Sequence, residues 1–171
     1  GSFATNLKLA GDVGITALAV TALARSGHAK APEVEKAVAF LLKNRHEDGS
    51  FWNDEQLFNY RTAVALMALH AVDPVKYAKE IKAAQDYVAG IQVSEATGAK
   101  KADPNFGGIG YGSDPKRNDM SNTQIALQAL KESGYSNDEV FKRAAEFAAK
   151  CQNLQATNLQ ASNPEVKVGV G

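Results

Sequence analysis

Three copies of one short stretch decide the fold of this chain. The first reads Thr16-Ala17-Leu18-Ala19-Val20-Thr21-Ala22-Leu23. The later copies are Thr62-Ala63-Val64-Ala65-Leu66-Met67-Ala68-Leu69 and Thr123-Gln124-Ile125-Ala126-Leu127-Gln128-Ala129-Leu130. Each copy has Thr first, Ala three and six residues later, and an aliphatic residue four and seven residues later. Residues at offsets of three, four and seven share one helix face, so each copy predicts a largely apolar helix.

A second apolar segment follows each copy at helical spacing, and charged residues separate its apolar positions. The three segments are Val34, Ala37, Phe40, Leu41; Ile81, Ala84, Tyr87, Val88; and Phe141, Ala144, Phe147, Ala148. This alternation predicts three helical hairpins, each with an apolar inner helix and an amphipathic outer helix. Repeated hairpins of this kind bury a core mainly against their neighbours.

Capping residues, glycines and prolines predict where the helices begin and end. Asp12 and Gly27 bound the first helix, Pro32 starts the second, and Ser121 with Gln124 forms a capping-box pattern before the fifth. A long connection with several glycines precedes that fifth helix, over residues 93–118. The predicted helices are 12–26, from 32, 57–72, 74–92, from 121, and 138–152.

Composition excludes several classes of protein. Nineteen basic and nineteen acidic residues give no net charge, so no basic field favours nucleic acid. The single Cys151 excludes an internal disulfide and a thiolate metal cluster, and no apolar run is long enough for a transmembrane segment. Gly1 and Ser2 look like residues left by cloning, within an N-terminal extension 1–10. Residues 154–171 read as an irregular tail, and the cellular compartment is left open.

The turns that join successive hairpins carry a resemblance to a known superfamily. Gln92 and Gln152 end outer helices, Arg45 stands at the first such position, and the turns read Asp48-Gly49-Ser50-Phe51-Trp52 and Phe106-Gly107-Gly108-Ile109-Gly110-Tyr111. Over residues 11–153 the chain resembles the terpenoid cyclase and protein prenyltransferase superfamily, and in particular bacterial prenyltransferase and squalene oxidase repeat proteins. The resemblance implies an all-α fold, a partial α/α toroid of about six helices in three hairpins.

The same resemblance bears on activity through Asp119-Met120-Ser121-Asn122-Thr123. In the similar protonation-initiated cyclases, this position reads Asp, any residue, Asp, Asp, Thr, and the middle Asp protonates an alkene or epoxide. That acid must be held protonated by burial and a like-charged neighbour. Ser121 and Asn122 replace the two later acids, and neither can serve as that acid. The resemblance therefore implies a cyclase-like domain without proton-initiated cyclase activity, and no catalytic residue is assigned.

No metal or cofactor is predicted, because His28, His46 and His70 lack metal-ligand spacing with Cys151. Residues near the starts of the inner helices, and aromatic residues of the turns, are candidates for a cavity or ligand site. For each there is a structural alternative: a helix-start acid for Asp119, a salt bridge for Arg61, and plates over helix ends for the aromatic residues. The candidates are Asp12, Trp52, Tyr60, Arg61, Tyr111, Asp119 and Asn122.

The residues and the resemblance together leave three functions open. The first is a domain that binds an apolar, isoprenoid-like molecule or a protein segment. The second is a fragment of an active isoprenoid cyclase whose acid pair lies on missing repeats. The third is a polysaccharide-active α/α toroid, for which clustered acids and aromatic residues would be needed. Because a closed toroid of this superfamily needs more than three hairpins, a homodimer that closes the ring is a further expectation.

Overall fold

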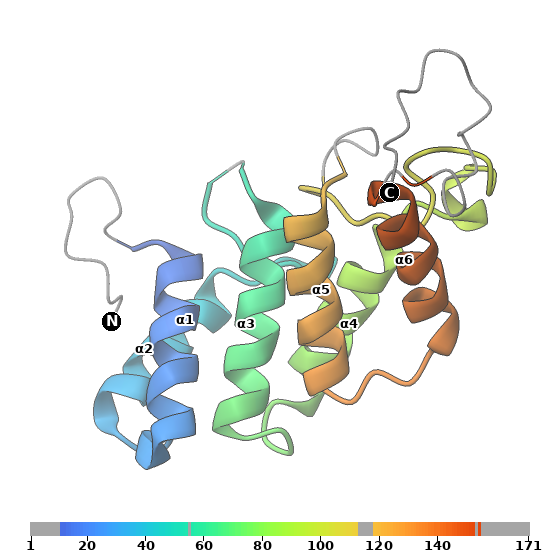
Figure 1. Ribbon diagram of the computed structural model, residues 1–171. Helices are drawn as coiled ribbons and strands as arrows, with labels where there is room; N and C mark the ends of the chain where they lie inside the picture. The colour runs from blue at the N-terminus through green and yellow to red at the C-terminus, as the bar shows by residue number, and fades with distance from the viewer. Residues whose placement is uncertain (1–10, 55, 113–117, 153, 155–171) are drawn as a thin grey trace. The chain divides into compact units, whose positions relative to one another are not determined.

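The computed structural model describes residues 11–54, 56–112, 118–152 and 154. Within these residues the chain forms α-helices and no β-strand, which confirms the all-α prediction. The expected N-terminal extension 1–10, and the predicted tail apart from residue 154, lie outside the described residues. The helices in Figure 1 are α1 (Val13–Leu23), α2 (Pro32–Lys43), α3 (Phe58–Val72), α4 (Ala78–Gly90), α5 (Met120–Glu132) and α6 (Asp138–Cys151).

The chain divides into two compact units, and each is described by itself. Unit 1 contains residues 1–90 and 125–135, and unit 2 contains residues 91–124 and 136–171. Unit 1 therefore holds the first two hairpins and most of α5. Unit 2 holds the long connection, the first residues of α5 and the whole of α6.

The core of unit 1 lies around α1 and α3, which pack side by side (Figure 1). Every residue of α3 from Arg61 to Leu69 is buried, as expected for a helix whose sides are nearly all apolar. The outer helices α2 and α4 pack against α1 and α3, respectively. Each buries one stripe only, Val34, Ala37, Val38 and Leu41 in α2 and Ile81, Ala84, Gln85 and Val88 in α4.

The core of unit 2 forms where α6 packs against the connection that precedes α5. The buried stripe of α6 is Val140, Ala144, Phe147 and Lys150, spaced by three or four residues. Phe106 and Ile109 of the connection are fully buried. The Gln92 side chain donates hydrogen bonds to the carbonyl oxygens of Gly107 at 3.1 Å and Val140 at 2.8 Å, so it joins the connection to α6.

The capping signals predict most helix ends. Asp12 caps α1, with its Oδ1 accepting a hydrogen bond from the backbone N–H of Ile15 at 2.8 Å. Gly27 adopts φ +86° in a π-helical turn, Ala24–His28, that follows α1. A left-handed glycine at this point ends the helix, as predicted.

Two predicted helix starts were wrong. The fourth helix begins at Ala78 and not at Pro74, because Asp73 Oδ1 accepts hydrogen bonds from the N–H groups of Val75 and Lys76 in a separate turn. The capping-box prediction at Ser121 was also wrong. Asp119 takes that role, since its Oδ1 accepts the Asn122 N–H at 2.8 Å, and α5 begins at Met120. At the fourth helix the predicted cap, Asp73, serves the turn that precedes the helix. At the fifth helix Asp119 takes the place of the predicted cap, Ser121.

Candidate functional site

In unit 1, candidate residues meet at the starts of α1 and α3. Arg61 lies in the first turn of α3, and only 6% of its surface is exposed. Its Nη2 donates to Asp12 Oδ2 at 2.7 Å, so the cap of α1 also anchors α3. This ion pair joins residues 49 positions apart in the chain and holds the two inner helices together at this end.

A second acid, Asp54, completes the environment of Arg61. Arg61 Nη2 lies 2.7 Å from Asp54 Oδ2, and Nη1 donates to the Gln56 carbonyl oxygen. The hydrogen bond from Arg61 lowers the pKa of Asp54, despite some burial. Burial acts to lower the pKa of Arg61, but the two carboxylates outweigh it and raise that pKa. The positive charge of Arg61 is therefore balanced by the carboxylates of Asp12 and Asp54, and its guanidinium is not free to bind an anionic ligand.

The sequence pattern did not predict Asp54 as a partner of Arg61. A local feature links Asp54 to a turn, because its Oδ1 accepts a hydrogen bond from the Gln56 N–H two residues later, at 3.0 Å. Leu57, which follows, has φ +55°, a conformation that non-glycine residues rarely adopt. A turn of this kind brings an acid back toward the helix that it leads into.

Tyr60 approaches the same place, and Gly14 makes the close packing there feasible. A Cβ atom on Gly14 would lie 3.2 Å from Asp12 Oδ1, 3.4 Å from Tyr60 Cε1 and 3.5 Å from Arg61 Cγ. Tyr60 is half-buried. The structure thus brings Asp12, Tyr60 and Arg61 together.

Trp52 belongs to an aromatic stack beside this cluster. Its ring stacks on His46 with centroids 3.8 Å apart, and Phe58 meets it edge-on at 4.9 Å. The indole Nε1 donates to Ser50 Oγ at 2.8 Å. Because Phe58 is the first residue of α3, the indole packs over a helix end, which was the structural alternative for this residue.

In unit 2, Asp119 and Asn122 form one hydrogen-bonded pair at the start of α5. Asp119 Oδ1 accepts the Asn122 backbone N–H at 2.8 Å, and Oδ2 accepts Asn122 Nδ2 at 2.9 Å. Asn122 is 6% exposed, whereas Ser121 is exposed. Both carboxylate oxygens of Asp119 are thus acceptors within the first turn. Tyr111 lies half-buried in the connection before α5.

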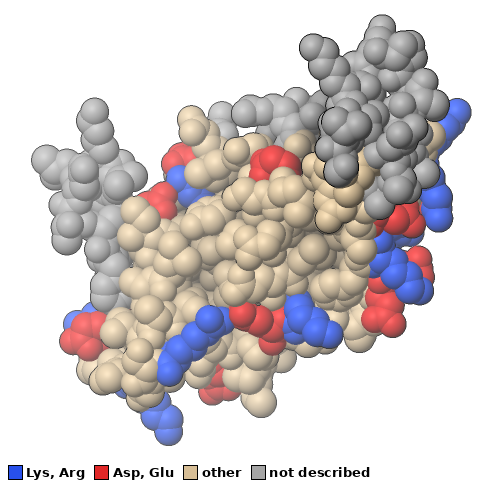
Figure 2. Space-filling model, in the orientation of Figure 1, with Lys and Arg blue, Asp and Glu red and all other residues tan. Residues whose placement is uncertain are grey.

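The surface over α1 and α3 carries little charge. Figure 2 shows an extended area without Lys, Arg, Asp or Glu on this face. The sequences of α1 and α3 contain only one such residue, the buried Arg61. Leu18 is 44% exposed on α1. This area favours apolar contacts over ionic ones.

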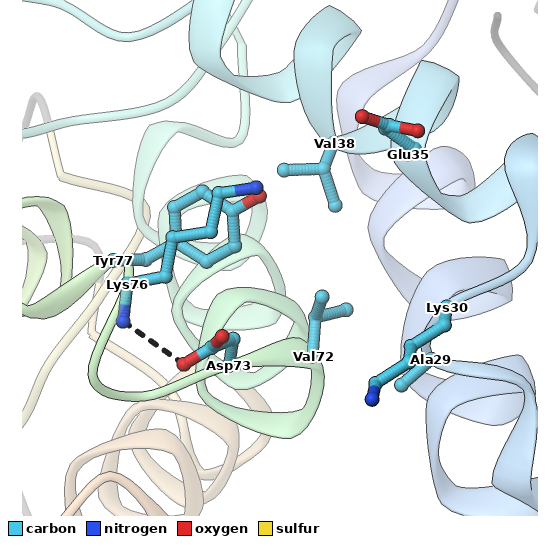
Figure 3. Close-up of a pocket in the computed structure, with 8 residues that line it drawn as sticks. All are labelled: Ala29, Lys30, Glu35, Val38, Val72, Asp73, Lys76 and Tyr77. Atoms are coloured by element: carbon cyan, nitrogen blue, oxygen red, sulfur yellow. Dashed lines mark hydrogen bonds between the residues drawn. The ribbon is translucent and has the colours of Figure 1, made fainter.

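A cavity of about 260 Å³ lies in unit 1 near the opposite ends of α1 and α3 (Figure 3). Val38 and Val72 supply its apolar lining, and no sequence-predicted candidate residue lines it. Its two lysines are balanced by two acids, and Asp73 already caps the Val75 and Lys76 N–H groups. The cavity therefore selects for neither sign of charge. The lining residues are Ala29, Lys30, Glu35, Val38, Val72, Asp73, Lys76 and Tyr77.

A family model described as the squalene-hopene cyclase C-terminal domain matches residues 7–168. No match was found among curated proteins or among solved structures. In the described part of the chain, no group of three His, Cys, Asp or Glu residues could hold a metal ion. No described helix is both long and apolar enough to span a bilayer.

Proposed function

Because this chain belongs to the squalene-hopene cyclase C-terminal domain family, we propose that it binds an apolar, isoprenoid-like molecule without proton-initiated cyclase activity. The observation that carries the proposal is the set of hydrogen bonds accepted by the two acids at the starts of the inner helices, Asp12 and Asp119. Both Asp12 and Asp119 are occupied as hydrogen-bond acceptors in helix caps. Neither is arranged as a proton donor.

Protonation of an alkene requires a carboxylic acid that carries its proton into the reaction. Asp12 accepts from a backbone N–H and from the Arg61 guanidinium, which has no proton acceptor of its own. Asp119 accepts two hydrogen bonds from Asn122. Positions 121 and 122 hold a hydroxyl and an amide, so neither of them supplies a second carboxylate that could share a proton with Asp119. The chemistry of the described residues therefore favours binding over turnover.

The nature of the ligand is argued from the inner helices. Their exposed surface in unit 1 comes from α1 and α3, whose one charged residue, Arg61, is buried in ion pairs. A charged substrate would lose its hydration there without gaining a partner. An apolar molecule gains about 25 cal/mol for each Å² of apolar surface that it removes from water. Leu18, the most exposed large apolar residue of α1, lies on this surface.

The test is a thermal-shift titration of the purified chain with squalene and a polyprenyl alcohol, with product formation followed in the same samples. A ligand that binds only the folded state raises the melting temperature by mass action. Leu18→Lys places a charge on the proposed surface and is expected to abolish the shift. Val75→Lys is the matched control, because Val75 is 84% exposed in the turn before α4 and its substitution should leave the shift unchanged.

Product formation would contradict the assignment of Ser121 and Asn122 as non-acidic replacements, and would require another proton donor. A shift of equal size in the wild type and in Leu18→Lys would place the ligand elsewhere. The absence of any shift with either lipid would refute the apolar-ligand proposal and would favour a protein segment as the partner.

A further inference from the structure

An open pocket of about 340 Å³ lies in unit 1, at the ends of the inner helices opposite to the Arg61 ion pairs. Met67, His70 and Ala71 line it from one face of α3, since they are spaced by three and four residues. Arg25, from the turn that follows α1, and Glu132, the last residue of α5, complete the lining. Small-molecule sites typically measure about 300–1,000 Å³, so this volume suits one end of a chain-like molecule.

The apolar surface of α1 leads to this pocket. Leu18, Ala22 and Arg25 follow one another at offsets of four and seven, so they share one face of α1 and its helical continuation. All three are exposed. Seven residues of helix rise by about 10 Å, which separates the leucine from the arginine. Figure 2 shows basic and acidic side chains along the lower border of the uncharged area. An apolar molecule that lies on Leu18 therefore has a polar group within reach of one end.

The polar groups of the pocket hold one another and keep further hydrogen-bonding capacity. Arg25 Nη2 forms an ion pair with Glu132 Oε2, and Gln128 Nε2 donates to Glu132 Oε1 at 2.9 Å. A guanidinium carries five N–H donors, and this pair engages one of its nitrogens. A carboxylate offers about four lone-pair sites. The pair can thus donate one hydrogen bond to a ligand and accept another from it.

The charge of this set favours a neutral head group over an anion. The formal charges of Arg25 and Glu132 cancel, and Glu132 and His70 lie in the last turns of α5 and α3, where the helix dipole is negative. A phosphate or carboxylate would meet that negative field and compete with Glu132 for its arginine. A hydroxyl accepts from the guanidinium and donates to the carboxylate without separating them.

We propose, on the basis of the apolar-ligand function above, that the ligand is an isoprenoid-like alcohol whose hydroxyl is held between Arg25 and Glu132. Its chain then lies along α1 over Ala22 and Leu18, and its first carbons contact Met67. The pocket supplies the direction in which the chain lies, because only one end of the molecule is polar.

The experiment is isothermal titration calorimetry of the full chain with farnesol, farnesyl methyl ether and farnesyl phosphate. The ether keeps the chain and an acceptor oxygen but has no O–H to donate. Farnesol is expected to bind at least about threefold more tightly than the ether, the effect of one hydrogen bond. The phosphate is expected to bind more weakly than farnesol.

Two variants and two matched controls locate the head group. Glu132→Met removes the acceptor and should abolish the difference between farnesol and its ether. Arg25→Met removes the donor and should weaken farnesol binding by about threefold or more. The controls are Asp86→Met and Lys82→Met, which break an ion pair of similar exposure on the outer helix α4 and should leave all three affinities unchanged.

Equal affinity for farnesol and its ether in the wild type would overturn the alcohol head group and leave the apolar-ligand proposal standing. Tighter binding of the phosphate would assign an anionic head group and contradict the inference. A preference for farnesol that survives Glu132→Met would place the hydroxyl elsewhere and also overturn it. If none of the three compounds binds, the inference fails, and if squalene also gives no thermal shift, the proposed function fails with it.

Discussion

At the scale of single residues, Arg61 contributes most to the start of the inner helices. Its guanidinium pairs with two acids and a carbonyl oxygen while 7% of its side chain is exposed. Hydrogen bonds to charged groups are stronger than neutral ones, and a buried group left without them incurs a desolvation cost. Arg25, which pairs with Glu132, provides a comparison, since 51% of its side chain is exposed.

Replacing Arg61 with Met is expected to lower the free energy of unfolding by about 1.5–3 kcal/mol, the range for hydrogen bonds to charged groups. Arg25→Met should change it by less than about 1 kcal/mol, as for other exposed ion pairs. Urea unfolding of both variants, followed by circular dichroism, makes the comparison. Equal losses in the two variants would show that burial of the Arg61 pairs adds nothing.

At the scale of elements, the glycine turns determine how the connection meets an outer helix. Gly107 and Gly134 both have positive φ values, +90° and +79°. A Cβ atom on Gly107 would overlap the Arg143 carbonyl, whereas one on Gly134 would meet nothing within 4 Å. Comparing substitutions at Gly134 and Gly107 therefore separates two contributions to the free energy of unfolding: the left-handed backbone conformation, which both share, and the close approach to α6, which only Gly107 makes.

Gly134→Ala is expected to cost about 1–2 kcal/mol, the price of a left-handed conformation for an L-residue. Gly107→Ala should cost at least about 3 kcal/mol more, or prevent folding, because two backbone segments would have to separate. The midpoint of urea unfolding and the soluble yield measure the difference. Similar midpoints for the two variants would mean that the turn and α6 can move apart cheaply.

The helices also show which parts of the fold could be predicted from the sequence alone. Apolar spacing and the caps at Asp12, Gly27 and Pro32 were sufficient for the six helices, since those signals act within one turn. The start of α4 was misjudged because Asp73, the predicted cap, closes a separate turn before the helix. The cap of α5 was misjudged because Asp119, and not Ser121, accepts the free N–H group. The Arg61–Asp12 pair spans 49 residues, and no local pattern encodes it. Sequence could suggest Arg61 as a salt-bridge residue, but only the packing of α1 on α3 identifies its partner.

At the scale of the whole molecule, the pH dependence of stability should report on Tyr87 of α4. Burial, with a smaller contribution from the Asp48 charge, raises the pKa of Tyr87 to about 12. The unfolded chain has an ordinary tyrosine pKa near ~10. Between these values the unfolded state loses its proton first, so stability present below pH ~10 is lost as the pH rises toward ~12.

At pH ~11 this linkage is expected to remove about 1 kcal/mol from the wild type but not from Tyr87→Phe, which cannot ionise. Urea unfolding of both proteins from pH ~8 to ~11 makes the test, and the change in their difference with pH is the readout. Parallel curves would show that Tyr87 ionises as easily in the folded chain as in the unfolded one.

The contact of Gly49 and Gly107 with main-chain carbonyl oxygens has a consequence for the history of such repeats. Each turn meets the helix that it touches through atoms that every amino acid possesses. Most substitutions in that helix therefore leave the junction intact, and a duplicated hairpin can fit beside its neighbour before its side chains have diverged. Within each turn, the glycine is the residue whose replacement would bring a Cβ atom into that carbonyl group. In a chain built in this way, hairpins can be added, lost or exchanged while the rest of the sequence changes. Catalytic residues can likewise be replaced without loss of the helical architecture.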